Sequence, residues 1–347
     1  ALALTRTLPV ALCRLMHSVA PLSASAAARE RLRWRLAFGG MMAAMLIFGA
    51  NFVVSRHAVL NGLTSHDLLA LRFATAGFIL LPTFLSAGGL NDCGGVGWSR
   101  GLTLAVMSGL PMSWLLLTGL TYAPAAHGAV IGPGTVTVIG IIGGVVLFGT
   151  ALTRQLFLGI GAVLVGLICL GIAGTTHTNP TILLGDLCFL GVGLVWGGYP
   201  LVIQLWRVDA LKATAIVSVL SIVYLPLYFL FFFRGFDVAP WWVILAHAIN
   251  QGVLNIIVGL WIWSWATRVL GPAVVGRFPP TIPVIGTLLG IPVLGEIPTG
   301  LQVAGIALII AGLFVASWRR STRAAIEPHQ GEVPADADGE TQPERKP

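Results

Sequence analysis

The feature that most constrains this chain is a succession of long apolar segments that runs through most of its length. The hydrocarbon core of a bilayer, about 30 Å thick, is crossed by a helix of roughly 20 apolar residues, so these segments predict membrane-spanning helices. Of the 347 residues, 56% are hydrophobic and 10% are charged, too few charges to cover a surface in water. We therefore expect an all-α integral membrane protein in a lipid bilayer. Ten spans are expected, over residues 36–56, 67–87, 101–122, 127–148, 155–174, 184–205, 213–233, 241–264, 272–293 and 299–318.

The net charge of +7 comes from basic residues that are scattered singly between the apolar segments. They form no patch of the kind that binds nucleic acid, so no nucleic-acid partner is expected. Under the positive-inside rule, their positions place both termini in the cytoplasm, with Arg56 and Arg234 outside. The many arginines, alanines and glycines are typical of a GC-rich bacterial genome, so the membrane is expected to be a bacterial inner membrane. The basic residues expected in the cytoplasm are Arg29, Arg31, Arg33, Arg35, Arg100, Arg154, Arg207, Lys212, Arg268, Arg319, Arg320 and Arg323.

The two ends of the chain differ in composition from the apolar region. Residues 1–35, rich in Ala, Ser and Arg, are expected to be a poorly ordered cytoplasmic leader, and whether they belong to the mature protein stays open. Residues 319–347, rich in Pro and acids, are expected to be a disordered cytoplasmic tail. Between them, residues 36–174 and 184–318 are expected to form two five-helix units.

Several chemical functions are disfavoured by the sequence. Cys13, Cys93, Cys169 and Cys188 form no CxxC pair, so they indicate neither a disulfide framework nor a metal site. The sequence contains no phosphate-binding Walker loop, and no HExxH or GxSxG motif supports an enzyme. We expect no cofactor and no catalytic residue. A receptor or scaffold is also disfavoured, because the longest segments outside the spans are the two tails.

The two five-helix units are related by an internal repeat with a shift of 146 residues. Each unit contains an odd number of spans, so the second crosses the membrane in the opposite direction to the first. Inverted repeats are typical of secondary transporters, whose halves expose a central site alternately. Duplication that serves stability alone is the alternative. The matched pairs are Pro133 and Pro279, Thr135 and Thr281, Val138 and Val284, Ile139 and Ile285, Gly140 and Gly286, Gly149 and Gly295, Thr153 and Thr299, Gly159 and Gly305, and Gly166 and Gly312.

Both repeats resemble a known family. Residues 133–167 and 279–313 each contain a proline, a glycine, a short polar link and a Gly-rich helix, and they resemble the two EamA domains of the drug/metabolite transporter superfamily. The segment FGANFVVSRHAV, residues 48–59, is similar to that family's first helix. Arg72, within LRFATAGFILLP, matches the family's usual arginine in the second helix.

The resemblance covers roughly residues 36–318. It implies ten helices, both termini inside, and transport of small metabolites, often export of amino acids or related compounds. One departure concerns an acid that the family commonly carries after the glycine that closes the fourth and ninth spans. Glu296 supplies this acid in the second half, whereas Thr150 stands there in the first, so the halves need not contribute equally.

The eighth expected span carries the strongest group of polar residues. His247, Gln251 and Asn255 follow at four-residue spacing with Asn250 beside them, so all four lie on one side of a helix. Polar groups are costly in hydrocarbon and normally face the bundle interior or a wet cavity. They are therefore candidates for binding a polar substrate. Hydrogen bonds between packed helices are the alternative role.

Prolines in the fourth and ninth spans remove backbone hydrogen bonds at matching points of the two halves. Paired interruptions point to the central site of a transporter, and Thr135 and Thr281 stand beside them with hydroxyl groups for a substrate. A kink that serves packing alone is the alternative. The expected helix breaks are at Pro133, Pro279, Pro280 and Pro283.

Other spans add further candidates. Arg72 and Arg277 lie close enough to span ends for their charges to reach the interface, or they recognise a carboxylate or phosphate; the family match favours Arg72 for the second role. Asn51 and Tyr199 occupy equivalent places in the first and sixth spans and are expected to line the cavity from two sides. A tyrosine is also a common interfacial anchor.

Coupling to protons would need a group that titrates within the membrane. His247, whose imidazole titrates near neutral pH, and Glu296 are the candidates for coupling. Glu296, Asp67 and Asp186 all lie near span ends, where we expect contact with solvent.

The expected function is a secondary permease that moves a small polar metabolite by alternating access, with export of amino acids or related compounds favoured. The alternative is an importer or exchanger of nucleotide-sugars, lipid precursors or phosphorylated compounds, which more cationic groups in the cavity would favour. The sequence leaves open whether the chain is a monomer or a homodimer.

Overall fold

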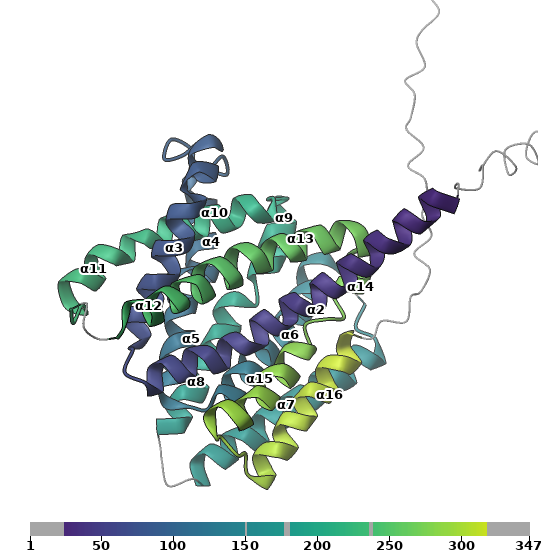
Figure 1. Ribbon diagram of the computed structural model, residues 1–347. Coiled ribbons are helices and arrows are strands. Elements are labelled where there is room, and N and C mark those ends of the chain that lie inside the picture. Colours follow the sequence, from purple (N-terminus) through teal and green to yellow (C-terminus); the bar gives the residue numbers. More distant parts are fainter. Residues whose placement is uncertain (1–23, 150, 177–180, 236–238, 318–347) are drawn as a thin grey trace, which may run out of the picture.

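The computed structural model describes residues 24–149, 151–176, 181–235 and 239–317. Within these ranges the chain is helical, with no strand (Figure 1). Nine of the described helical stretches are long and apolar enough to cross a membrane, and a shorter apolar helix, Thr281–Leu294, stands at the ninth span. The all-α class and the ten spans are confirmed. The expected tail and residues 1–23 of the expected leader lie outside the described residues.

The first half contains spans one to five. Its first helix begins well before residue 36, so residues 24–35 of the expected leader are helical, which corrects that prediction. Ala, Arg, Glu and Leu in this segment are strong helix formers. Gly109 divides the third span into two helices. The elements are α2 (Ala24–Leu60), α3 (Ser65–Ser86), α4 (Trp98–Ser108), α5 (Leu110–Tyr122), α6 (Ala125–Phe148) and α7 (Arg154–Thr176).

The second half contains spans six to ten, several of them in pieces. The expected ninth span starts at residue 281 and not at 272, because a turn separates a short helix from the main one. The elements are α8 (Thr181–Trp196), α9 (Tyr199–Trp206), α10 (Ala210–Leu220), the 3₁₀-helix η1 (Ser221–Val223), α11 (Tyr224–Phe231), α12 (Trp241–Ala248), the π-helix η3 (Ile249–Val258), α13 (Gly259–Leu270), α14 (Pro272–Val275), α15 (Thr281–Leu294) and α16 (Gly300–Ser317).

The last helices of the two halves, α7 and α16, lie side by side (Figure 1). A β-carbon on Gly166 would lie 2.6 Å from the carbonyl oxygen of Gly305, and one on Gly159 would lie 2.9 Å from that of Gly312. Small residues allow this close approach of membrane helices. The repeat carries Gly159 onto Gly305 and Gly166 onto Gly312, so the two contacts are equivalent ones related by a two-fold axis. This is the geometry of an inverted repeat.

The two halves also start at opposite ends of the bundle. Arg56, in the last turns of α2, pairs with Glu296 between α15 and α16, with 3.0 Å from Nε to Oε1. Oε2 of Glu296 accepts a hydrogen bond from the backbone of Ala125, where α6 begins, over 2.8 Å. His127 in α6 in turn contacts Asp186 near the start of α8. Thus α2 ends where α8 begins, and we call this the Glu296 end of the bundle.

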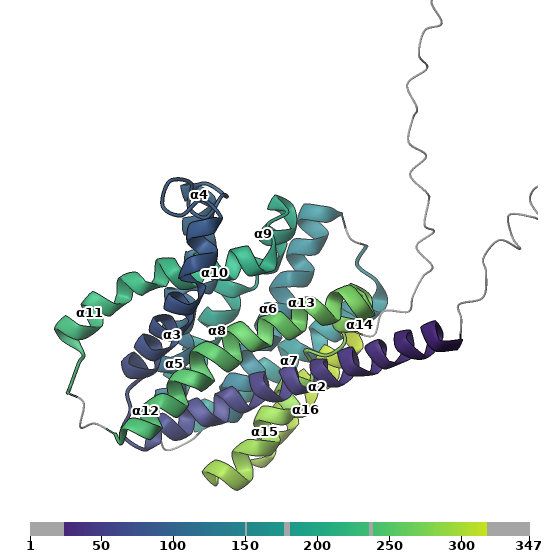
Figure 2. The same cartoon turned by 45° about the horizontal axis from the view of Figure 1, so that its top comes forward.

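The helix α2 contacts both halves and positions part of the candidate site. It lies along α13 (Figure 2), and α15 packs against it as well. Met41 and Met45 of α2 are fully buried with Ala266 of α13 in one apolar cluster. Polar residues follow on the next turns of α2. Since α2 packs against helices of both halves, the side chains of these residues lie between the halves.

The outer surface of the bundle is apolar. Trp241, Leu230 and Val146 are between 73% and 75% exposed. Apolar patches of this kind suit contact with lipid rather than water. Polar side chains such as Arg72 and Gln251 lie inside instead, and they form the candidate site.

Candidate functional site

Arg72 of α3 lies in the interior of the bundle, with 7% of its surface exposed. Its Nε and Nη2 both donate hydrogen bonds to Oε1 of Gln251, over 3.0 and 2.6 Å. Its Nη1 donates to Oγ of Ser113 on α5 over 3.2 Å. Both acceptors are neutral oxygens. A buried charge that lacks an opposite charge is costly, so this guanidinium is suited to receive an anion.

A chain of hydrogen bonds continues from Gln251 to α2. Nε2 of Gln251 donates to Oγ of Ser55 over 2.7 Å, and this hydroxyl donates to Oδ1 of Asn51 over 3.3 Å. The same oxygen accepts from Nδ2 of Asn250 and of Asn255, each over 3.1 Å. Helices α2, α3 and α5 belong to the first half and η3 to the second. We call the set the Arg72 network: Asn51, Ser55, Arg72, Ser113, Asn250, Gln251 and Asn255.

The element that carries three of these residues is a π-helix, η3. Residues five apart therefore meet, and Nδ2 of Asn255 donates to the backbone carbonyl of Asn250 over 2.7 Å. The expected four-residue spacing of an α-helix is wrong here, although the polar side chains still converge. Gly252 lets η3 approach α3, because a β-carbon there would lie 2.5 Å from Cβ of Thr75. π-Helical segments are rare and are frequently found at functional sites.

Two predicted site residues are buried near the network without a described hydrogen bond to it. His247 lies one turn before Gln251 and is 8% exposed. Its Nδ1 has no hydrogen-bond partner among the described residues. Thr135 packs closely on α8 at Gly193, and within the same described ranges its hydroxyl has no partner. Both side chains keep a polar atom available for a ligand.

Two other predicted site residues form hydrogen bonds outside the Arg72 network. The hydroxyl of Thr281 donates to the backbone carbonyl of Phe278 over 2.7 Å, within the turn that starts α15. Tyr199 lies in an apolar cluster with α10, and its hydroxyl is hydrogen-bonded to Ser108 and Thr214. The structure therefore does not bring Tyr199 together with Asn51 in the Arg72 network.

The prolines behave differently in the two halves. Pro133 lies inside α6, which continues through it without interruption; the expected break there is wrong. Pro279 and Pro280 lie in the turn before α15, so the break in the ninth span is confirmed. Pro283 lies in the first turn of α15, where the missing N–H of proline is not needed. The two interruptions are therefore not paired.

The acids near span ends are less exposed than expected. Asp67 and Asp186 are 5% and 4% exposed, respectively, so the expected contact with solvent is wrong for both. Neighbouring helices cover them: Asp67 accepts hydrogen bonds from the hydroxyl of Tyr228 and from Arg234, each over 2.7 Å. Glu296, the coupling candidate, is held by its ion pair and by the start of α6.

Comparison with known proteins agrees with this architecture. The profile described as the EamA-like transporter family matches residues 35–172 and residues 183–318, one match in each half. The chain belongs to the EamA-like transporter family. This EamA-like protein is therefore a multi-pass membrane transporter, and the resemblance of both repeats to EamA domains is confirmed.

The fold of this EamA-like transporter is also found in solved structures. One of them, titled only "Crystal structure of protein", matches 81% of this chain and 96% of its own, with a TM-score of 0.51 and 19% sequence identity. At that identity the likeness shows the fold alone. No curated protein matches the chain.

Sequence reasoning missed four buried polar residues of this EamA-like transporter. Ser55 stands one turn after Asn51, so its place on the same face of the helix could have been predicted. Ser113 gave none, because a serine in a helix can bond to its own backbone. His127 and Gln302 are polar residues within spans and could have been found by the argument that selected His247.

Proposed function

We propose that this transporter is a secondary carrier that exports a small metabolite with a carboxylate group, an amino acid or a related compound, by alternating access. The observation that carries the proposal is the buried guanidinium of Arg72, whose described hydrogen-bond partners are the neutral oxygens of Gln251 and Ser113. A substrate carboxylate would supply the missing opposite charge.

A carboxylate fits this arrangement for geometric reasons. The guanidinium is a planar fork that binds two carboxylate oxygens at once. Two of its nitrogens now share one oxygen of Gln251, so an amide occupies the position that two anionic oxygens would take. Exchange of one acceptor for another leaves no buried donor unpaired, which keeps the cost of substrate release low.

The rest of the network suits the polar remainder of an amino acid. Oδ1 of Asn51 accepts three hydrogen bonds, from Ser55, Asn250 and Asn255. An ammonium group could replace these donors, since it carries three N–H bonds and no acceptor. The described network contains one cation and no acid, which favours a singly charged carboxylate over the nucleotide-sugars and phosphorylated compounds of the alternative.

Alternating access is supported by the place of the network between the two halves. Arg72 belongs to the first half and Gln251 to the second, so separation of the halves would open their contact. The positive-inside rule favours both termini in the cytoplasm of a bacterium and the Glu296 end outside. Of the two coupling candidates, His247 keeps a ring nitrogen without a partner among the described residues, whereas Glu296 is engaged.

Counterflow in proteoliposomes tests the substrate class. The full-length chain is reconstituted and offered the common amino acids in radiolabelled form, with radiolabelled UDP-glucose as the nucleotide-sugar probe. We expect exchange of at least one amino acid, and loss of that exchange in Arg72→Gln. Arg100→Gln is the matched control, because Arg100 lies over the ring of Trp206, away from the network.

The outcomes separate the alternatives. Exchange of UDP-glucose without any amino acid would favour the nucleotide-sugar carrier, and exchange of neither would overturn the proposal. Direction is tested in cells that overproduce the chain: export predicts tolerance to toxic amino-acid analogues, and greater sensitivity would indicate import.

A further inference from the structure

A second buried polar cluster lies at the Glu296 end. Nδ1 of His127, on α6, lies 2.7 Å from Oδ1 of Asp186 on α8. Nε2 of the same ring lies 3.0 Å from Nε2 of Gln302 on α16. The three residues are 1%, 4% and 5% exposed. We call them the Asp186 cluster; it joins the first half to the second and shares no described hydrogen bond with the Arg72 network.

The hydrogen bonds fix where the protons in this cluster are. The backbone N–H of Thr299 can only donate, and it lies 2.8 Å from Oε1 of Gln302, so the side-chain amide presents its NH₂ group to His127. Nε2 of His127 must then accept, and its proton is on Nδ1, from where it is donated to Asp186. The imidazole is therefore neutral, and a second proton on it would face the amide N–H of Gln302. The free place for a proton is on Asp186.

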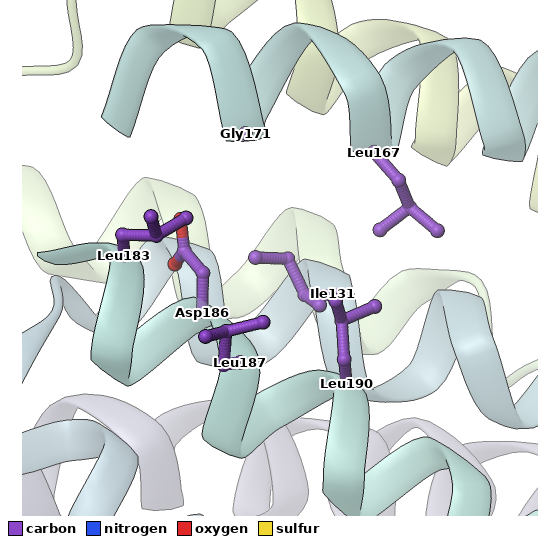
Figure 3. A pocket seen from close by; sticks show the side chains of 7 residues that line it. All are labelled: Ile131, Leu167, Gly171, Leu183, Asp186, Leu187 and Leu190. Atoms are coloured by element: carbon purple, nitrogen blue, oxygen red, sulfur yellow. The ribbon is translucent and has the colours of Figure 1, made fainter. Parts of the chain in front are cut away.

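The other carboxylate oxygen, Oδ2 of Asp186, has no hydrogen-bond partner among the described residues. Asp186 lines a cavity of about 60 Å³ between α6, α7 and α8. Figure 3 shows the carboxylate among the apolar side chains of this cavity. A cavity of this size could hold a water molecule, but a buried water needs two to four polar partners, and Asp186 is the one polar side chain in this lining. The second oxygen therefore faces carbon in this structure. The other lining residues are Ile131, Leu167, Gly171, Leu183, Leu187 and Leu190.

We propose that the carboxylate of Asp186 is a proton-binding site, which takes up one proton from water on Oδ2 when the Glu296 end closes and returns it to water when that end opens. The opening and closing rest on the alternating access proposed above. A carboxylate whose second oxygen faces hydrocarbon is costly, and protonation removes that charge without disturbing the bond from His127. Once the end opens, water stabilises the ionised form instead.

A proton fits the site better than a metal cation. Sodium and larger cations need several oxygen ligands, whereas the cavity offers one carboxylate oxygen and otherwise carbon; a proton needs one lone pair. The described residues also contain no group of three or more metal-ligating side chains. At the Glu296 end, the other titratable or charged groups on the elements packed around the cluster are Arg56, His57, Tyr122, Cys169, Cys188 and Glu296. Of the charged ones, Arg56 and Glu296 neutralise each other.

The repeat does not duplicate this cluster. The shift of 146 residues carries His127 onto Ala273 and Leu156 onto Gln302. Neither partner position can bind a proton. The site therefore acts at one end of the bundle and distinguishes the two directions of opening, which an exactly symmetric transporter could not do.

Infrared difference spectroscopy on the purified full-length protein tests the proposal, with the proton itself as the probe. A protonated carboxylic acid has a carbonyl stretch that an ionised one lacks, and in apolar surroundings this stretch lies at a higher frequency than in water. Acidification should therefore produce a band of Asp186 apart from that of the solvated acids among the 13 Asp and Glu residues. We expect the band in the wild type, its loss in Asp186→Asn, and a displaced band in Asp186→Glu, which keeps a carboxyl group on a longer side chain. Glu296→Gln is the matched control and should keep the wild-type band.

Each possible result of this experiment supports or contradicts the proton-binding site. A wild type without a titrating band, a band that is unchanged in both Asp186 variants, or a band lost in Glu296→Gln would overturn the proposal. Should Asp186→Asn fail to fold, the displacement in Asp186→Glu decides alone. The experiment needs no transported compound, so failure of every amino acid in the counterflow assay would overturn the proposed function and leave the proton site standing.

Discussion

Arg72 on α3 and Gln251 on η3 are joined by two hydrogen bonds that end on a single oxygen, at 3.0 and 2.6 Å. The two residues belong to different halves of the inverted repeat, so this contact is made or broken when the halves move relative to each other. It also holds the one cation of the described polar network in place. Under the proposed function, the contact links recognition of a substrate carboxylate to the arrangement of the halves.

Removal of the amide should weaken transport. In Gln251→Ala, release of a substrate carboxylate would leave Arg72 with the hydroxyl of Ser113 as its described acceptor. A lost hydrogen bond to a charged group costs about 1.5–3 kcal/mol, so release, which counterflow needs, becomes slower. We expect counterflow of the transported amino acid to fall by roughly ten- to a hundredfold, since about 1.4 kcal/mol is a factor of ten. Gln204→Ala makes the same change at an exposed position of α9 and should leave transport unchanged. Equal transport by both variants would remove Gln251 from the site.

The contact between α7 and α16 should tolerate no side chain. A β-carbon on Gly166 would lie 2.6 Å from the backbone of Gly305, whereas one on Gly161 of the same helix meets nothing within 4 Å. We expect Gly166→Val to lower the free energy of unfolding by about 1–3 kcal/mol, typical of overpacking, and Gly161→Val to be nearly neutral. Thermal unfolding in detergent measures the difference. Equal midpoints for the two variants would contradict the packing described here.

The sequence predicts the fold well because both of its signals are strong and local. Apolar length identifies the spans, and the match of Gly159 with Gly305 identifies the repeat. It predicts the site less well, because backbone details decide which polar groups meet. No residue type marks the π-helix that brings Asn255 to Asn250 in the way that a proline marks a helix break. Pro133 does mark a break by residue type, yet it lies in an unbroken helix.

Burial at span ends is the other limit of sequence reasoning. Asp67 and Asp186 stand a few residues into their spans, a position that indicates solvent when each helix is taken alone. Packing against other helices covers both, with the hydroxyl of Tyr228 on Asp67 and the imidazole of His127 on Asp186. These partners are far away in the sequence, so no local pattern could predict them.

The loop before α4 should protect a thiol. Cys93 is fully buried there, and burial, aided by the charge of Asp92, raises the pKa of its thiol. A raised pKa lowers the thiolate fraction at a given pH, so labelling with maleimide should be slow, increase about tenfold per pH unit, and level off at a higher pH than in the unfolded chain. The variant for this measurement retains Cys93 and replaces Cys13, Cys169 and Cys188 by Ala. Identical pH profiles for folded and detergent-unfolded protein would contradict a buried thiol.

Opposite orientation of the halves can be tested at two positions that the repeat makes equivalent. A shift of 146 residues carries Ala151, exposed after α6, onto Ile297, which is 82% exposed after α15. In a cysteine-free background, we expect an impermeant maleimide to label Ile297→Cys on intact cells, and Ala151→Cys after permeabilisation. The reason is that the two links lie at opposite ends of the bundle and the positive-inside rule places the Glu296 end outside.

The three possible patterns of labelling have different consequences. Labelling of both positions from the same side would contradict the inverted repeat and, with it, alternating access between the halves. Labelling of Ala151→Cys alone on intact cells would keep the fold and reverse its direction in the membrane. Asp186 would then take up its proton from the cytoplasm, and its charge would favour opening of the bundle toward the inside.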